Sequence, residues 1–134
     1  MLKSLFLFKN EKGQALVEFA LVVMMLFLIL FGIVEFGRIF SASLTITHAA
    51  REGARVGIVS SNSTREEEII SAIQNRASVL NLNDDNHTIA ILPDPGTASR
   101  GDQLTITITY DVDLIVPIIS QILPNPFTLN STAI

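Results

Sequence analysis

A long apolar run dominates the pattern of hydrophobic and polar positions in the first third of the chain. No charged residue occurs from Phe19 to Val34, and Ala15–Val17 and Ile39–Phe40 extend the apolar character on both sides. At 1.5 Å per residue, about 20 such residues cross a hydrocarbon core of about 30 Å. The run therefore predicts a transmembrane helix. Because no proline follows it closely, we expect the helix to continue to about Val59.

The pattern changes after that helix to shorter elements. Polar residues at 60–63 interrupt the helix, and Thr64-Arg65-Glu66-Glu67 is typical of a capping box that starts another one. This second helix is amphipathic and ends by Asn81–Asn83. Its apolar residues recur at helical spacing: Ile69, Ile70, Ile73, Ala77 and Leu80.

Strands are expected in the remainder of the chain. Residues 104–110 alternate between apolar side chains and threonine, which predicts a strand with Leu104, Ile106 and Ile108 on one face. We also expect strands at Thr88–Leu92 and, at an edge, Phe127–Ile134, and one or two helical turns within Leu114–Leu123. The expected fold class is α+β, with a long N-terminal transmembrane helix followed by a small extracytoplasmic domain with a short antiparallel sheet.

Charge divides the chain into two unequal parts. Residues 1–58 carry six Lys or Arg against four Glu, whereas residues 59–134 carry three Arg against nine acids. Three lysines precede the apolar run, so the positive-inside tendency places the N-terminus in the cytoplasm, although three arginines beyond the run weaken the bias. The acidic outer region lacks the basic face that phosphate neutralisation requires, and we therefore expect no nucleic-acid partner.

Glu18 lies just inside the predicted membrane helix. A carboxylate there costs about 2.5–3.5 kcal/mol on insertion scales and normally has a partner. One interpretation keeps Glu18 hydrated among the lipid headgroups, and the other pairs it with a cation from another chain. If the chain were cut after Gly13, the new α-amine of Gln14 would lie four residues before Glu18. That amine could pair with the Glu18 of the same chain or of a neighbour.

The apolar run also fits a secretory signal peptide with a small-residue cleavage site at Ser41-Ala42-Ser43. Two features disfavour this alternative. The stretch before the apolar run is long for the n-region of a signal peptide, and Glu18 would interrupt the apolar block.

Three stretches carry a family resemblance. Residues 12–19, Lys-Gly-Gln-Ala-Leu-Val-Glu-Phe, resemble the type III processing site of type IV pilin-like proteins. Residues 32–38 (GIVEFGR) and 49–55 (AAREGAR) resemble the two signatures of the TadE-like family, which are minor pilins, or pseudopilins, of the tight-adherence (Tad) pilus. Residues 101–110 resemble the later strand of the family more loosely. The C-terminal Asn130–Ile134 departs from the family, whose members often finish near a Met-Arg pair.

The resemblance implies that a prepilin peptidase cuts between Gly13 and Gln14, with possible N-methylation of Gln14. It also implies that Glu18 guides register among pilin or pseudopilin subunits, in a pilus that serves surface adhesion. The chain then divides into a leader (1–13), a membrane and assembly helix (14–58) and an extracytoplasmic domain (59–134), anchored in the cytoplasmic membrane by a single span. Two alternatives stay open: an uncleaved single-pass protein that presents a binding domain, and a module secreted after cleavage at Ser43.

Residues beyond the apolar run are candidates for helix packing or for an interface: Glu35, Arg38, Arg51, Glu52, Gly53, Arg55 and Gly57. Glu35 and Arg38 are three apart and can form an ion pair on the helix surface, which we favour over an inter-subunit contact. Gly53 and Gly57 have the spacing that lets another backbone approach closely, first that of this chain's own sheet and next a second subunit's helix. The other charges indicate a solvated or sheet-capping face.

Residues for catalysis or metal binding are scarce. The chain has no cysteine, and its two histidines, His48 and His87, lack metal-ligand spacing. Asp84-Asp85-Asn86 lacks the glycine and terminal glutamate of a calcium-binding EF-hand. No phosphate-binding glycine loop or nucleophile elbow occurs. We expect no enzyme, no cofactor and no metal site.

Overall fold

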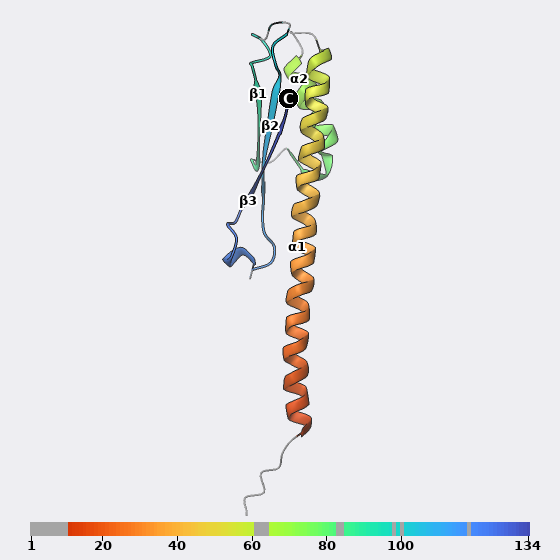
Figure 1. Cartoon of the computed structure of the whole chain (residues 1–134), viewed down its shortest axis with the longest axis vertical. Helices are drawn as coiled ribbons and strands as arrows, with labels where there is room; N and C mark the ends of the chain where they lie inside the picture. The colour runs from red at the N-terminus through yellow and green to blue at the C-terminus, as the bar shows by residue number, and fades with distance from the viewer. Residues whose placement is uncertain (1–10, 61–64, 83–84, 98, 100, 118) are drawn as a thin grey trace, which may run out of the picture.

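One helix runs through almost the whole length of the molecule (Figure 1). The computed structural model describes residues 11–60, 65–82, 85–97, 99, 101–117 and 119–134, with side chains from Gly13 onward. Helix α1 (Glu11–Val59) has 49 residues, which corresponds to a length of about 74 Å. It ends at Val59, where the sequence predicted that it would.

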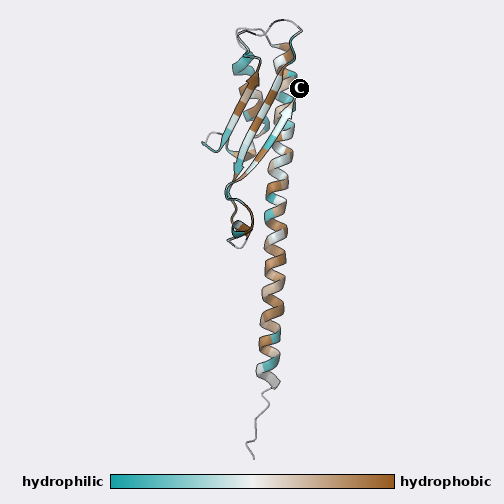
Figure 2. Ribbon diagram, turned by 60° about the vertical axis from the view of Figure 1, so that its left-hand side comes forward, coloured by the Kyte–Doolittle hydropathy of each residue, from teal (hydrophilic) through white to brown (hydrophobic). Residues whose placement is uncertain are grey.

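The N-terminal half of α1 stands free of the rest of the chain. Figure 2 shows this half as a mostly brown, apolar rod below the sheet. Between Leu16 and Val34 its large apolar side chains, apart from the less exposed Val23, are about half to two-thirds exposed. None of the most apolar 18-residue window is buried within the molecule. The core helix of a soluble protein would hide such a window. The helix is long and apolar enough to cross a membrane, which suggests a single-pass membrane protein.

A small three-stranded sheet packs beside the C-terminal half of α1. The strands are β1 (His87–Leu92), β2 (Thr105–Val112) and β3 (Phe127–Ala133). They form an antiparallel meander in the order β1-β2-β3, with Ile108 opposite both Ile89 and Ser131. The α+β class and the long N-terminal helix are therefore confirmed.

A shorter helix completes the domain. Helix α2 (Arg65–Arg76) is followed by the 3-10 turn η1 (Ser78–Leu80), and a second 3-10 turn, η2 (Ile119–Gln121), lies between β2 and β3. The buried core contains side chains of both helices and of two strands: Ile46, Ala49, Ala50 and Ala54 of α1, Ile69 and Ile73 of α2, Ile106 and Ile108 of β2, and Ala133 of β3. Ile89 and Ile91 of β1 and Leu80 of η1 are partly buried and pack against this core. Both helices thus cover the same face of the sheet.

The strand expectations agree with the structure to within two residues at each end. In the predicted strand at 104–110, Ile106 and Ile108 are fully buried, whereas Thr107 and Thr109 hydrogen-bond across to β3. The expected capping Thr64 lies outside the described residues, as do Asp84 and the leader up to residue 10. The division at residues 58 and 59 stays a prediction. The core of the outer domain also uses α1 from Ile46 to Ala54.

Candidate assembly and membrane surface

The motif at the proposed processing site occupies the first turns of α1. Because α1 begins at Glu11, the bond between Gly13 and Gln14 lies one turn inside the helix end. Gln14 and Glu18 are both exposed. The described residues supply the Glu18 carboxylate with neither a hydrogen bond nor an ion pair, so a cation for it would have to come from elsewhere.

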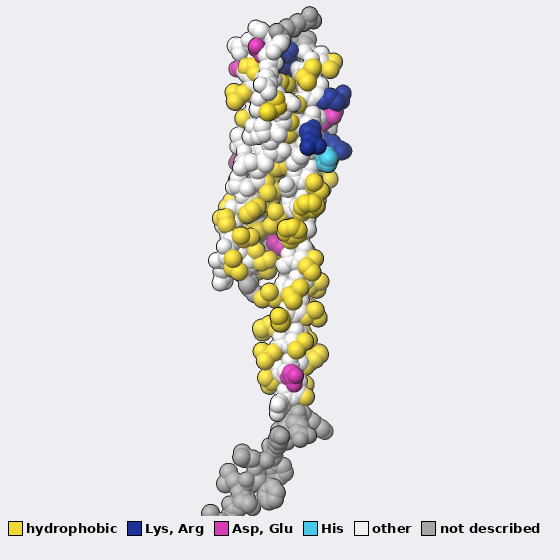
Figure 3. Space-filling model, viewed as in Figure 1, with side chains coloured by type: hydrophobic (Ala, Val, Ile, Leu, Met, Phe, Trp, Pro, Cys, Tyr) yellow, Lys and Arg dark blue, Asp and Glu magenta, His cyan; other side chains and the backbone are white. Residues whose placement is uncertain are grey.

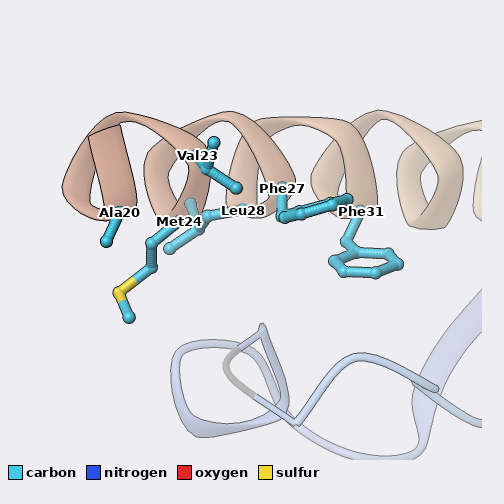
Figure 4. A pocket seen from close by; sticks show the side chains of 6 residues that line it. All are labelled: Ala20, Val23, Met24, Phe27, Leu28 and Phe31. Atoms are coloured by element: carbon cyan, nitrogen blue, oxygen red, sulfur yellow. The ribbon is translucent and has the colours of Figure 1, made fainter. Parts of the chain in front are cut away.

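The helix beyond this motif presents an apolar surface on all sides. Yellow side chains cover its lower half in Figure 3, and a shallow hollow runs along one face in Figure 4. Among the described residues, those that line the hollow all belong to α1: Ala20, Val23, Met24, Phe27, Leu28 and Phe31. The rings of Phe27 and Phe31 stack with their centroids 6.0 Å apart. Such a surface suits lipid chains or other apolar helices, and it offers no group for chemistry.

Glu35 ends this apolar surface and is almost completely buried, with 1% of the residue exposed. Its Oε1 accepts a hydrogen bond from Arg38 Nη1 at 2.8 Å and another from the backbone N–H of Ile115 at 3.3 Å. The Arg38 guanidinium also donates weakly, at 3.5 Å, to the carbonyl oxygen of Asp113. We call this group, formed by Glu35, Arg38, Asp113 and Ile115, the Glu35 clip.

The Glu35 clip joins α1 to the segment that leaves β2. The ion pair between Glu35 and Arg38 is present as expected, but Glu35 lies beneath that segment and not on the open helix surface. The sequence could not reveal this, because Ile115 lies 80 residues further along the chain. The only sequence signal for a partner of Glu35 was its position directly after the apolar run, where an unpaired charge is costly.

Gly53 and Gly57 allow α1 to approach the rest of the domain. A Cβ added at Gly53 would lie 2.8 Å from Cγ1 of Ile73, and one at Gly57 would lie 2.8 Å from Cδ1 of Ile69 and closer still to Leu104. Both distances are below van der Waals contact. The neighbours are Ile106 of β2 and Leu104, which directly precedes β2, together with Ile69 and Ile73 of α2. A second subunit's helix at this stripe stays a prediction.

The remaining charged candidates face solvent. Dark blue side chains gather on one flank of the upper part of α1 in Figure 3. Both Arg51 and Arg55 of α1 are exposed. Arg55 Nε donates to Glu52 at 2.9 Å. This hydrogen bond lowers the pKa of the Glu52 carboxyl and raises the pKa of Arg55. The pair lies about 25 Å beyond Glu35 along the helix, well outside the uncharged stretch. It is a solvated pair and adds little to stability.

The histidines do not form a site together. His48 is exposed on α1, whereas His87 begins β1 on the sheet. Across the described ranges no three His, Asp or Glu side chains are grouped as metal ligands would be.

Comparison with known proteins bears on residues 13–55, about a third of the chain. Residues 13–55 match the model of a family described as TadE-like protein. The match covers the processing motif from Gly13 onward, the Glu35 clip residues on α1 and the stretch at 49–55, and it confirms the resemblance over that region. No curated protein and no solved structure matches the chain at a significant level.

Proposed function

We propose, from the premise that residues 13–55 are TadE-like, that this chain is a pilin-like subunit of a Tad-type pilus. In this proposal a prepilin peptidase cuts between Gly13 and Gln14, and the mature chain joins other pilin or pseudopilin subunits, for surface adhesion. The N-terminus lies in the cytoplasm and the domain lies outside the cytoplasmic membrane. The observation that carries the proposal is the motif at 12–19 opening a helix whose apolar half is unburied in the single chain.

The exposed half of α1 supports assembly by a simple physical argument. In the membrane its apolar side chains are solvated by lipid, and outside the membrane they require a protein environment. Parallel packing of several such helices would supply it. The groove lined by Val23, Phe27 and Phe31 has the shape that a neighbouring helix would fill.

Glu18 fits the same proposal. After cleavage the α-amine of Gln14 would be the nearest new cation, one helical turn away on α1. A pairing of Glu18 with a neighbour's amine would fix the axial position of one subunit against the next. A pairing within the same chain would only neutralise the charge.

The alternative of a secreted module receives less support. Ser41-Ala42-Ser43 lies within α1, where Ala42 is buried and the hydroxyl groups of Thr45 and Thr47 donate to the carbonyl oxygens of Ser41 and Ser43. A cut there would require this helix to unwind. It would also remove Glu35 and Arg38 from the domain.

The decisive test is the N-terminus of the membrane-extracted protein, expressed with and without a prepilin peptidase. Intact mass and N-terminal sequencing should show a start at Gln14 only when the peptidase is present. Gly13→Ala should leave the precursor uncut under the same conditions. A start at Met1 in both samples would favour the uncleaved single-pass protein, and a start at residues 42–44 would favour the secreted module.

A further inference from the structure

The segment between β2 and β3 is unusually apolar for an exposed loop. No charged residue occurs from Leu114 to the C-terminal Ile134. Within the described residues 114–117 and 119–126, which we call the η2 loop, Ile115 is 68% exposed and Ile122 is 78% exposed. Exposed apolar side chains gathered on one loop are typical of a surface that contacts a membrane or a partner.

The position of the η2 loop is set by the Glu35 clip. The bond from the Ile115 N–H to Glu35 holds the start of the loop at the end of the uncharged part of α1. From there the loop extends below the sheet, toward the N-terminal half of α1, in both Figure 1 and Figure 2. Its tip therefore lies level with apolar turns of α1 and not with the domain.

The same level corresponds to the outer side of a bilayer that α1 crosses. Glu18 and Glu35 bound the uncharged stretch and are about 26 Å apart along the helix axis, close to the thickness of a hydrocarbon core. Glu35 and Arg38 then lie near the outer boundary of the core. A loop that descends from Glu35 enters the lipid interface.

Most of the described backbone N–H groups of the η2 loop have a hydrogen-bond partner, which suits that environment. Backbone polar groups without partners are costly in lipid. Here the N–H of Leu114 donates to Asn125 Oδ1, and that of Ile115 donates to Glu35. Four further N–H groups donate to carbonyl oxygens within the loop, those of Ile119, Ser120, Ile122 and Leu123. Prolines 117, 124 and 126 have no N–H to satisfy.

We propose that the η2 loop is a second membrane contact of this chain, inserted shallowly into the outer leaflet of the bilayer that α1 spans. Ile115, Ile122 and Leu123 enter the lipid, while Gln121 and Asn125 stay among the headgroups. The Glu35 clip transmits this contact to α1, so that the loop and the helix together fix the height of the domain above the membrane. The proposal requires that α1 spans the membrane, and it does not depend on cleavage at Gly13 or on assembly.

Fluorescence quenching by brominated lipid tests the proposal on the full-length, uncut chain. The protein has no tryptophan, so Ile122→Trp introduces a single reporter at a position that tolerates a larger side chain because it is exposed. Ile58→Trp is the matched control. Ile58 is similarly exposed, at 74%, but lies about 35 Å further along α1 than Glu35. Each variant is placed, one copy per disc, in nanodiscs of phosphatidylcholine brominated near the carbonyl end of its acyl chains.

We expect the Ile122→Trp variant to lose about half of its fluorescence or more to the brominated lipid, and the control to lose almost none. Quenching of the Ile122→Trp variant as weak as that expected for the control would overturn the proposal, because the loop would then be in water. A second outcome would also overturn the proposal: no quenching by bromine, together with protection of the fluorescence of the Ile122→Trp variant from aqueous iodide only when each disc holds several copies. The η2 loop would then contact a second copy of this chain and not the lipid. Unchanged far-ultraviolet circular dichroism of both variants confirms that they fold.

Discussion

Two carboxylates at the ends of the uncharged stretch of α1 meet opposite environments. Glu35 is buried and receives hydrogen bonds from a guanidinium and a backbone N–H of its own chain. Glu18 is exposed and has no such partner among the described residues. A carboxylate at membrane depth without a cation is costly. The chain therefore supplies hydrogen-bond donors to Glu35, whereas Glu18 is available to pair with another molecule.

Replacement of Glu18 tests whether this carboxylate pairs with another subunit during assembly. Glu18→Ala should leave cleavage after Gly13 intact but lower incorporation into membrane-extracted assemblies about tenfold, equivalent to about 1.4 kcal/mol of lost pairing. Cross-linking followed by quantitative immunoblotting measures the incorporated fraction. Glu66→Ala, which removes an exposed acid on α2, is the control and should assemble normally. Normal assembly of the Glu18 variant would show that this carboxylate is only hydrated among headgroups.

Removal of Arg38 tests the Glu35 clip. Arg38→Ala leaves the buried Glu35 carboxylate without its cation and should lower the free energy of unfolding by about 1–3 kcal/mol, since Arg38 itself is partly solvated. Glu35→Gln should cost less, because an amide oxygen still accepts from the Ile115 N–H. Denaturant unfolding in detergent micelles provides the measurement. The control Arg55→Ala breaks an exposed pair of the same spacing and should change little. Equal losses at Arg38 and Arg55 would contradict a buried clip.

Among the elements, α1 combines two different packing surfaces. Its first half is apolar all round, whereas its second half presents alanine and glycine to α2 and the sheet. Small side chains are needed there because three layers converge on the helix. The geometry at Gly53 and Gly57 leaves no room for a methyl group unless Ile69, Ile73 or Leu104 moves.

Glycine substitutions on α1 separate these two surfaces. Gly57→Ala should destabilise the domain by about 1–3 kcal/mol through overpacking. Gly37→Ala, with no atom within 4 Å of the added methyl group, should be neutral or should stabilise the helix by up to about 1 kcal/mol. Thermal unfolding followed by circular dichroism compares the two. A Gly57 variant as stable as the Gly37 variant would mean that α2 and the sheet do not pack tightly on α1.

Local periodicity was sufficient to predict the elements, but not their tertiary contacts. Alternation at 104–110 placed Ile106 and Ile108 in the core, and the apolar run followed by small residues gave α1 its length. The Glu35 clip depends on a contact across 80 residues, which no local pattern encodes. The proximity of Ile69 and Ile73 to the glycines of α1 likewise depends on how α2 folds back. Gly13 and Glu18 could be proposed as site residues from the sequence because their motif is contiguous in the chain.

The whole molecule consists of a folded domain and the N-terminal half of α1, whose apolar surface the domain does not cover. The main core cluster joins α2 and the sheet to α1 from Ile46 onward, and Ala42 is buried one turn earlier. The Glu35 clip is the lowest tether described between the domain and α1. The free energy of folding of the domain therefore comes mainly from residues after the apolar run. The N-terminal half of α1 adds an apolar surface whose exposure to water is unfavourable.

This division predicts how a shortened chain behaves. Residues 39–134 alone should fold into a soluble, acidic monomer with the sheet and α2 intact, because they retain every core residue. The full chain should require detergent or lipid, since its exposed apolar half would otherwise associate. Size-exclusion chromatography and circular dichroism of both forms in detergent-free buffer provide the measurement.

The shortened chain should unfold somewhat more easily, because it lacks the Glu35 clip. Failure of the shortened chain to fold would show that α1 before residue 39 is part of the domain. A monomeric full chain without detergent would show that the exposed apolar surface needs neither lipid nor a partner helix.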